Sequence, residues 1–414
     1  MRVLIINTSE RIGGAAIAAN RLMKALKKNG VKARMLVRDK QTDHLTVVTV
    51  GSGWAHMLRF LWERLCIFIG NGFSRKRLFS VDIANTGIDI TQTQEFQRAD
   101  IIHLHWVNQG FLSTTGLRHI LQAGKPVVIT MHDQWYFTGI CHYSGNCEKY
   151  TTLCQQCEQQ GGWLLGDMAQ RLFRQKERLY HSAPLTFVGC SEWMASMARK
   201  SKLTQGHQVI SIPNAIDTDL FHPQDKAEAR KAFQLPLDKR LLLFGCQRIT
   251  DERKGFRYLE EALQLLKQEH PDIAQRTEIV VVGGQAEAVR DQVPFSIIPI
   301  SYVSDPQKMV QLYNAVDIYV TPSLQDNLPN TIMEALACGI PCVGFNVGGI
   351  PEMIDHQQTG YVARYQDAQD FANGILWTLS ADYSTLSHQA RTKAVTHYSE
   401  NAVARQYIKV YESL

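Results

Sequence analysis

Short apolar runs of strand type alternate with spacers of helix length along this chain, and this alternation restricts the fold more than any other feature. The first series has five such runs, at 3–8, 33–37, 100–106, 126–132 and 185–191. A second series follows at 240–246, 278–284, 296–303, 317–323 and 341–346. Runs that are apolar at nearly every position are typical of parallel strands covered by helices on both faces. The sequence therefore predicts an α/β fold with two doubly wound, parallel-sheet, Rossmann-like domains.

A segment without periodicity separates the two series. It reads PNAIDTDLFHP at 213–223 and has a proline at each end, as is typical of an interdomain linker. We expect an N-terminal domain over 1–212, a C-terminal domain over 224–396, and a terminal helix over 397–414 that returns to the N-terminal domain. Because ligands of open parallel sheets bind beyond the carboxyl ends of the strands, a cleft between the two domains is the expected active site.

The composition excludes several classes of protein. The 414 residues are 45% hydrophobic and 20% charged, a balance typical of a folded chain large enough for two domain cores. A formal net charge of +5 is too small over this length to indicate a nucleic-acid-binding surface, so no nucleic-acid partner is expected. The sequence MRVLIINTSE lacks the pattern of a signal peptide, and no run reaches the roughly 18 apolar residues of a spanning helix. We therefore expect a cytoplasmic protein.

Two glycines lie between the first strand-type run and the first helical segment. Gly13 and Gly14 precede a stretch that ends near Gly30. Backbone amides at such a helix start can approach an anion closely, since glycine has no side chain and the helix dipole favours negative charge. The spacing differs from the dinucleotide-binding pattern, and Arg38 rather than an acid follows the second run, which disfavours a dehydrogenase. A tight turn without a ligand is the alternative at this position.

The most specific segment is TPSLQDNLPNTIMEALACGIPCVGFNVGGIPEMI at 321–354. It predicts a helix from about Thr331 to Cys338, with Asn330 as the N-cap and Gly339 at the end.

Two acids flank the start of this helix. Asp326 precedes it, and Glu334, eight positions later, is expected in its first turn. A phosphate at the helix start would meet free amides, and the carboxylates could accept hydrogen bonds from sugar hydroxyls. Without a ligand, Glu334 would be a favourable charge near a helix start and Asp326 a solvated loop acid.

These residues resemble a known family. Two acids eight apart, in LPNTIMEALACGIPCV followed by GGIPEMI, are similar to the signature of the family 4 retaining glycosyltransferases, which have the two-domain GT-B fold. The resemblance extends to the glycine pair, the linker, the segment GCQRITDERKGF and the terminal helix. It implies transfer of a sugar from a nucleotide diphosphate donor by front-side displacement, in which the departing phosphate oxygen helps deprotonate the acceptor hydroxyl. No metal or other cofactor is then expected for catalysis.

The resemblance also implies roles for individual residues. Glu334 would bind the ribose hydroxyls of the nucleotide. Asp326, where family members usually have glutamate, would bind the donor sugar. We assign Gly14, Asn330 and Thr331 to donor binding as well.

Two cations follow the first run of the second series. Arg248 and Lys254 lie in GCQRITDERKGF, on a loop that is expected at the carboxyl end of the sheet. There they could neutralise the diphosphate leaving group as the glycosidic bond breaks. Taken alone they would be solvated loop charges, and their match to the family pattern favours the catalytic role.

Histidines follow or lie in two strands of the first series. His132 closes the run 126–132 and could donate a hydrogen bond to a sugar hydroxyl. The resemblance implies that a residue at this place contacts the donor sugar, whereas a lone histidine would be structural. His103 and His105 alternate with apolar residues and so share a face, and we assign His105 and Gly13 to the acceptor side. The predicted catalytic set is Arg248, Lys254, Glu334 and His132.

Four of the nine cysteines fall within 17 residues, in an insert of the first domain at 141–157. Cys141, Cys147, Cys154 and Cys157 could form a tetrahedral structural zinc site, with His142 as a substitute ligand. A redox-labile disulfide pair and chance are the alternatives.

The segment GWAHMLRFLWERLCIFIG at 53–70 is rich in Trp, Leu and Phe, and RKR follows at 75–77. A helix here could lie in a membrane interface and receive a lipid-linked acceptor. The alternative is an amphipathic helix packed on the first domain.

The sequence thus predicts a GT-B glycosyltransferase that moves a hexose-type sugar to a hydroxyl of a glycan or lipid-linked acceptor, in bacterial surface polysaccharide assembly. A GT-B nucleotide-sugar epimerase and a noncatalytic sugar-binding protein remain the alternatives. The donor base, the sugar, the acceptor and the linkage depend on loops that the motifs do not specify.

Overall fold

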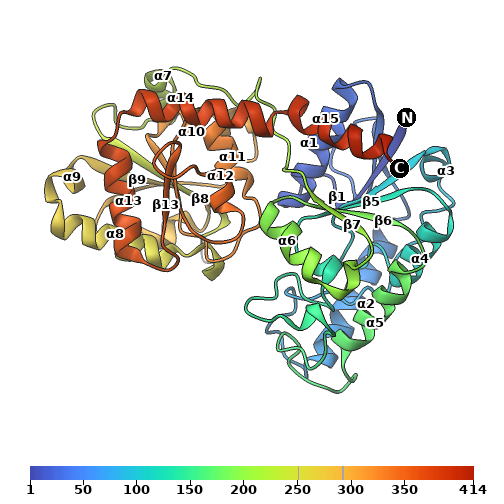
Figure 1. The fold of residues 1–414 in the computed structure, drawn as a ribbon. Coiled ribbons are helices and arrows are strands. Elements are labelled where there is room, and N and C mark those ends of the chain that lie inside the picture. The colour runs from blue at the N-terminus through green and yellow to red at the C-terminus, as the bar shows by residue number, and fades with distance from the viewer. Residues whose placement is uncertain (250, 291–292) are drawn as a thin grey trace. The chain divides into compact units, whose positions relative to one another are not determined.

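The structure, a computed structural model, describes residues 1–249, 251–290 and 293–414, including all their side chains except those of Gln247 and Arg248. The chain forms two units (Figure 1). Unit 1 comprises Met1–Asn214 together with Val403–Leu414, and unit 2 comprises Ala215–Ala402.

Unit 1 is built on a parallel sheet of seven strands in the order β3-β2-β1-β4-β5-β6-β7. The strands are β1 (Arg2–Ser9), β2 (Lys32–Asp39), β3 (Val47–Thr49), β4 (Ile101–Leu104), β5 (Val127–Met131), β6 (Leu185–Gly189) and β7 (Gln208–Ser211). The helices are α1 (Gly14–Lys28), α2 (Gly53–Gly70), α3 (Gln94–Arg98), α4 (Thr114–Gln122), α5 (Met168–Tyr180), α6 (Glu192–Lys200) and the part of α15 (Glu400–Glu412) that begins at Val403. Short 3-10 turns lie at Trp135–Phe137, Lys149–Thr151 and Lys202–Thr204.

Both faces of the unit 1 sheet are covered. Ile129 of β5 packs in a core with Ile120 of α4 and Phe173 of α5. Thr130, the next residue, points to the opposite face because side chains alternate along a strand, and its hydroxyl lies 2.9 Å from the Tyr407 hydroxyl of α15. One turn further along α15, a second tyrosine, at 411, bonds to β4. The end of α15 is therefore part of the helical cover of this sheet.

Unit 2 contains a six-stranded parallel sheet in the order β10-β9-β8-β11-β12-β13. The strands are β8 (Arg240–Arg248), β9 (Thr277–Gly284), β10 (Ser296–Ile300), β11 (Ile318–Thr321), β12 (Cys342–Phe345) and β13 (Gly360–Ala363). The helices are α7 (Lys226–Ala232), α8 (Phe256–Glu269), α9 (Pro271–Gln275), α10 (Pro306–Ala315), α11 (Asn330–Ala337), α12 (Ile350–Met353), α13 (Ala368–Ser380) and α14 (Tyr383–Lys393). Short helical turns add Glu252–Lys254, Ala286–Val289 and, as a π-helix, Ala394–Tyr398.

The unit 2 sheet is also covered on both faces. Val320 of β11 packs in a core with Leu259 of α8 and Phe371 of α13, two helices that lie side by side (Figure 1). Tyr319, the preceding residue, points the other way, and its ring centroid lies 6.1 Å from that of Tyr313 in α10. The prediction of two doubly wound α/β domains is therefore confirmed, because each predicted apolar run overlaps a strand of one of the two parallel sheets.

Residues from the segment 213–223 are held by unit 2 from Ala215 onward. The Arg391 guanidinium of α14 donates hydrogen bonds to the carbonyl oxygens of Thr218 and Phe221, at 2.9 and 2.6 Å. It also donates to the Ala337 carbonyl at the end of α11, at 2.7 Å. One half-buried guanidinium thus ties the entry of the chain into unit 2 to the helix that carries Glu334.

Candidate functional site

The strand order of unit 2 reverses between β8 and β11, because β9 and β10 extend the sheet on one side of this pair and β12 and β13 on the other. Ligands of doubly wound sheets bind beyond the carboxyl ends of the strands at such a reversal. Lys254 follows β8 and Asp326 follows β11, and the Lys254 Nζ atom lies 2.7 Å from Asp326 Oδ2. The structure therefore brings two predicted site residues, 72 positions apart in sequence, into contact where a ligand site is expected.

The electrostatics of this pair keep Lys254 charged. The side chains of Lys254 and Asp326 are 29% and 15% exposed. Burial lowers the pKa of Lys254, but the charge and hydrogen bond of Asp326 outweigh burial, so the pKa of Lys254 is raised. A fixed ammonium group is suited to an anionic ligand, because a diphosphate can replace Asp326 as its partner.

Two glycines allow the loops of this pair to approach closely. Gly255 has φ +67°, and a Cβ there would lie 1.9 Å from the carbonyl oxygen of Pro322. Gly348 has φ +60°, and a Cβ there would lie 1.8 Å from the carbonyl oxygen of Asp326. No side chain fits at either distance, and both backbones are left-handed, which glycine adopts without strain. These glycines set the positions of Lys254 and Asp326.

Helix α11 begins one residue earlier than its sequence predicts. Asn330 is the first helical residue and not the N-cap. Pro329 holds the cap position, at φ −63° and ψ 118°, without a side-chain cap bond. Glu334 accordingly lies in the second turn, and the prediction that placed it in the first turn is wrong. Proline adopts the extended conformation of a cap position readily because its φ is fixed near −65°, which leaves Asn330 to continue into the helix.

Helix α11 ends at Ala337, one residue before the predicted Cys338, and Gly339 follows the cap as the predicted stop. Gly339 has φ +73°, its amide bonds to the Leu336 carbonyl, and the Ile340 amide bonds to the Ala335 carbonyl, at 2.9 Å each. This pair of bonds is a Schellman motif, which satisfies carbonyl groups that the last turn leaves open.

Glu334 is held by a buried tyrosine. Its Oε2 atom accepts a hydrogen bond of 2.9 Å from the Tyr313 hydroxyl of α10, and Glu334 is 8% exposed. Burial and the neighbouring charge of Glu334 raise the pKa of Tyr313 well above its usual value, so the hydroxyl stays protonated and donates. Beside it, Thr331 hydrogen-bonds to the hydroxyl of Tyr319, which donates to the Gly245 carbonyl at 3.3 Å. Residues on α11 are thus oriented from α10 and β11.

Arg248 forms the end of β8, where its backbone pairs with Gly284 after a register shift that begins at Gly245. Its side chain lies outside the described residues, so the predicted role of Arg248 at a diphosphate stays a prediction.

In unit 1 the strand order reverses between β1 and β4, and Gly13 and Gly14 follow β1. Gly13 is the N-cap of α1 at φ +90°, and a Cβ there would meet no atom within 4 Å among the described residues. The start of this 15-residue helix therefore has open space beside its first amides. This geometry suits the predicted approach of an anionic group.

The three predicted or candidate histidines of unit 1 lie together. His105 Nδ1 lies 2.8 Å from His132 Nε2, and the other nitrogen of His132 lies 3.5 Å from the Cys190 sulfur. His103 bonds on one side to Thr130 and on the other to the Tyr411 hydroxyl, at 2.7 Å each, and is fully buried.

All three rings are neutral at ordinary pH. Burial and neighbouring histidines lower the pKa of His103 to about 3 and the pKa of His105 well below its usual value. Burial lowers the pKa of His132 to about 4. Binding of a sugar hydroxyl by His132 would replace one of its protein partners.

A buried charge network next to these histidines was not predicted from the sequence. His142 Nε2 lies 2.6 Å from Asp82 Oδ2, and His142 Nδ1 lies 2.7 Å from Asp133 Oδ2. Asp133 also accepts from the Trp106 indole at 2.8 Å, and Arg64 pairs with Asp82. Burial lowers the pKa of His142, but both aspartates outweigh it and raise this pKa to about 10. An imidazolium between two carboxylates has no lone pair for a metal, so His142 is not a substitute zinc ligand in this structure.

The cysteine insert contains a thiol pair. Cys141 donates a hydrogen bond to Cys157, which raises the pKa of Cys141 well above its usual value and lowers the pKa of Cys157 to about 7. Cys154 accepts from the Gly139 amide at 3.2 Å. Within the described residues, no three or more His, Cys, Asp or Glu side chains are grouped as a metal site. The zinc site stays a prediction.

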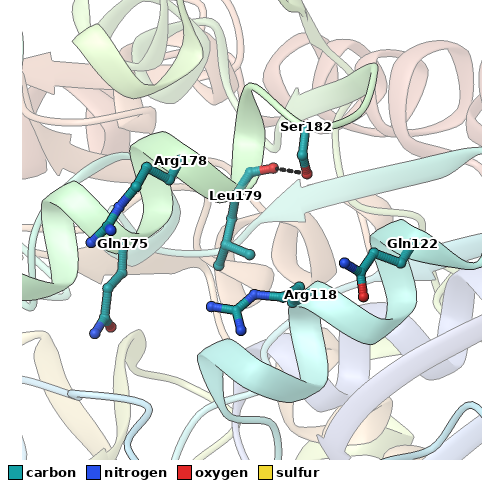
Figure 2. Close-up of a pocket in the computed structure, with 6 residues that line it drawn as sticks. All are labelled: Arg118, Gln122, Gln175, Arg178, Leu179 and Ser182. Carbon is teal, nitrogen blue, oxygen red and sulfur yellow. Dashed lines mark hydrogen bonds between the residues drawn. The ribbon is translucent and has the colours of Figure 1, made fainter.

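A separate cavity of about 510 Å³ lies in unit 1 and involves none of the predicted site residues. Figure 2 shows its lining from α4, from α5 and from the turn after α5: Arg118, Gln122, Gln175, Arg178, Leu179 and Ser182.

Two family models match the chain. Residues 12–220 match the model described as Glycosyltransferase Family 4, and residues 238–381 match the model described as Glycosyl transferases group 1.

Individual proteins agree with these matches. A D-inositol 3-phosphate glycosyltransferase of Corynebacterium aurimucosum is 24% identical, over 99% of this chain and 90% of that protein. WcaC of Escherichia coli, a glycosyltransferase named for colanic acid biosynthesis, is 24% identical, over 76% of this chain and 75% of that protein. Other curated relatives align over 40 to 52% of their own length.

The solved structure of Anabaena HepE in complex with UDP-glucose matches with a TM-score of 0.64 and 15% identity, over 100% of both chains. This likeness concerns the fold. With one family model matching half of the chain and two doubly wound parallel sheets in its structure, the chain belongs to glycosyltransferase family 4 and has the GT-B fold.

Proposed function

We propose that this protein is a retaining hexosyltransferase that uses a nucleotide diphosphate sugar as donor and a hydroxyl of a glycan or lipid-linked molecule as acceptor. The observation that carries the proposal is the contact of Lys254 with Asp326 at the strand-order reversal of unit 2, in the loop that leads to α11 with Glu334 and its tyrosine partner. HepE, which has the same fold, was solved with UDP-glucose, and WcaC is named for colanic acid biosynthesis. These likenesses support a role in bacterial surface polysaccharide biosynthesis.

In this proposal unit 2 binds the donor. Lys254 exchanges Asp326 for the diphosphate, since a phosphate oxygen carries more charge and accepts a similar hydrogen bond. Asp326, released from Lys254, accepts hydrogen bonds from hydroxyls of the donor sugar. Glu334, oriented by Tyr313, accepts from the ribose hydroxyls, and the first amides of α11 face the phosphates.

The transfer step then proceeds by front-side displacement. The acceptor oxygen bonds to the anomeric carbon on the face from which the diphosphate departs, the bond from that carbon to the phosphate oxygen breaks, and this oxygen takes the hydroxyl proton. Lys254 stabilises the departing charge. One preorganised donor of this kind typically lowers the activation barrier by about 3 kcal/mol. No carboxylate nucleophile takes part. We propose that no metal is needed for catalysis, because Arg248, Lys254 and the helix start supply a positive field.

In unit 1, the start of α1 at Gly13 and Gly14 and the histidine group are proposed to bind the acceptor and the near side of the donor sugar. We place the enzyme in the cytoplasm, at the inner face of the membrane when its acceptor is lipid-linked. Among the described residues, no helix has the length and apolar character needed to cross a bilayer.

The proposal is tested by thermal unfolding in the presence of UDP-, GDP-, ADP- and dTDP-sugars, because a ligand that binds only the folded state raises the unfolding temperature. We expect a shift with one class of donor, and loss of this shift in Glu334→Ala. Absence of a shift with every donor would contradict the proposal. Product analysis then separates transfer from epimerisation, since an epimerase changes the nucleotide sugar without an acceptor, and from a binding protein, which leaves it intact.

A further inference from the structure

Helix α2 is amphipathic in the opposite sense to a helix packed on a water-soluble domain. Its buried side carries His56, Glu63 and Arg64, which are 5%, 0% and 5% exposed. Its solvent side carries six large apolar side chains, each at least 44% exposed: Trp54, Met57, Leu58, Leu61, Trp62 and Leu65. The spacing of three and four residues places them on one face. Single exposed apolar residues are ordinary, but a continuous apolar helix face marks an interaction surface.

Buried polar bonds fix this orientation of the helix. Glu63 Oε1 accepts from the backbone amides of Ile83 and Ala84, at 3.1 and 2.9 Å. Arg64 donates to the Leu78 carbonyl at 2.7 Å and pairs with Asp82. Rotation of α2 to bury its apolar face would leave these groups without partners, which is costly for buried charges. The apolar face is therefore held toward solvent.

Two further exposed aromatic side chains lie close to α2 and contact phenylalanines of this helix. Phe79 is 61% exposed, and its ring centroid lies 6.5 Å from that of Phe60 in α2. Phe73 is 63% exposed and its ring lies 5.6 Å from that of Phe68.

The loop that follows the cysteine insert contacts the end of α2. The Gly161 amide donates a hydrogen bond to Asn71 Oδ1 at 3.1 Å. Trp163 and Leu164, which follow after Gly162, are 52% and 63% exposed. Segments about 90 positions apart thus present large apolar side chains together.

The exposed charged side chains of residues 53–80 have one sign. Arg75, Lys76 and Arg77 are all exposed and lie between Phe73 and Phe79 in sequence. The only acid in residues 53–80 is Glu63, which is fully buried. An apolar face bordered by exposed cations complements a bilayer with anionic headgroups, and tryptophans are enriched at the interface of such bilayers.

We propose that α2, residues 73–79 and residues 163–164 form a membrane-docking surface, which lays its apolar side chains in the interface of an anionic bilayer while Arg75, Lys76 and Arg77 contact the headgroups. The docking surface follows from exposure and charge alone. That it brings the enzyme to a lipid-linked acceptor rests on the proposed function.

The test is co-sedimentation of the full-length protein with vesicles of phosphatidylcholine, with and without phosphatidylglycerol. We expect binding to the anionic vesicles. The double variant Leu61→Glu/Trp62→Glu should not bind. Exchange of Arg75, Lys76 and Arg77 for glutamine should weaken binding on the order of 100-fold and remove the preference for anionic lipid, given the usual contribution of each cation near such a surface. A matched control is Leu237→Glu/Tyr302→Glu in unit 2, at side chains that are 59% and 60% exposed and that should not affect binding.

Two outcomes would overturn the proposal: the unmodified protein does not bind anionic vesicles, or the control weakens binding as much as Leu61→Glu/Trp62→Glu. If light scattering instead shows a dimer that the Leu61→Glu/Trp62→Glu variant abolishes, a second copy covers the face and the membrane proposal is wrong. Donor-induced thermal shifts of the same preparations keep the two proposals separate. A shift without vesicle binding contradicts only the docking surface, and vesicle binding without any shift contradicts only the transferase function.

Discussion

Lys254 Nζ and Asp326 Oδ2 lie 2.7 Å apart and join the loops that follow the two central strands of unit 2. Each member of the pair is held in place by a glycine that passes close to a carbonyl oxygen. A site built in this way is charged and preorganised before a donor arrives, so substitutions of its two members should differ in effect.

Lys254→Met should lower kcat/KM about 100-fold, because it removes one preorganised hydrogen-bond donor to the departing phosphate, an effect of about 3 kcal/mol. Lys254→Arg should retain more activity since it keeps the charge. Steady-state kinetics with the donor found by thermal shift would measure both. Lys231→Met, at an exposed lysine of α7, is the control and should match the unmodified enzyme. Equal activity of Lys254→Met and the control would exclude a role at the leaving group.

Tyr313→Phe should raise the KM for the donor about fivefold with a smaller change in kcat, because loss of one hydrogen bond to Glu334 costs about 1 kcal/mol. The ring stays in place, so the fold should tolerate the change. Tyr398→Phe removes the hydroxyl of another buried tyrosine of unit 2, which faces the Glu352 carbonyl at 3.4 Å, and should leave the KM unchanged. If both variants change the KM equally, Tyr313 does not act through Glu334.

His142→Gln should destabilise the protein by about 3–5 kcal/mol near neutral pH, because it leaves Asp82 and Asp133 facing each other without their shared cation. The pKa of His142 is raised in the folded state to about 10. The stabilisation of the fold by protonated His142 is therefore complete below about pH 6.5, the pKa of this histidine in the unfolded chain. It is lost as the pH rises through 10.

Urea unfolding of the unmodified protein and His142→Gln across this pH range would measure the difference. The two should converge toward alkaline pH, and His388→Gln, at an exposed histidine of α14, should show no such dependence. A constant difference in the free energy of unfolding at every pH would contradict a charged His142.

The zinc prediction can be tested by metal analysis of protein purified under reducing conditions without a histidine tag. A structural site should give about one zinc per chain, and Cys154→Ser/Cys157→Ser should reduce it to background. Protein without zinc but with unchanged stability would contradict the site. A disulfide between Cys141 and Cys157 on mild oxidation, detected by peptide mass spectrometry, would support the redox alternative.

The sequence predicted the strands well, because a strand covered on both faces of a parallel sheet is apolar at nearly every position. The strands that the sequence did not predict are short and lie at the edges of the sheets. They are Val47–Thr49, Gln208–Ser211 and Gly360–Ala363, each of three or four residues. Runs of this length carry too little pattern to be separated from loops.

Local signals placed the donor-site acids to within one helix turn but misplaced the start of α11, since both Pro329 and Asn330 are acceptable at a helix start. Periodicity identified the apolar stripe of α2 but did not show which side faces solvent. That choice depends on Glu63 and Arg64 bonding to residues 78–84. The contact of His142 with Asp82 joins residues 60 positions apart, and no spacing rule predicts such a pair.

Unit 1 is complete only when α15, the last helix of the chain, has been synthesised. Tyr407 and Tyr411 bond to Thr130 and His103 in the middle of the unit 1 sheet, yet all of unit 2 lies between them in the chain. As the ribosome delivers residues in order, Thr130 and His103 emerge long before their partners. Unit 2 is continuous in sequence, so it can fold while unit 1 still lacks its last helix. During translation the nascent N-terminal sheet therefore exposes two polar groups and an apolar face, a stage at which chaperones would be expected to bind.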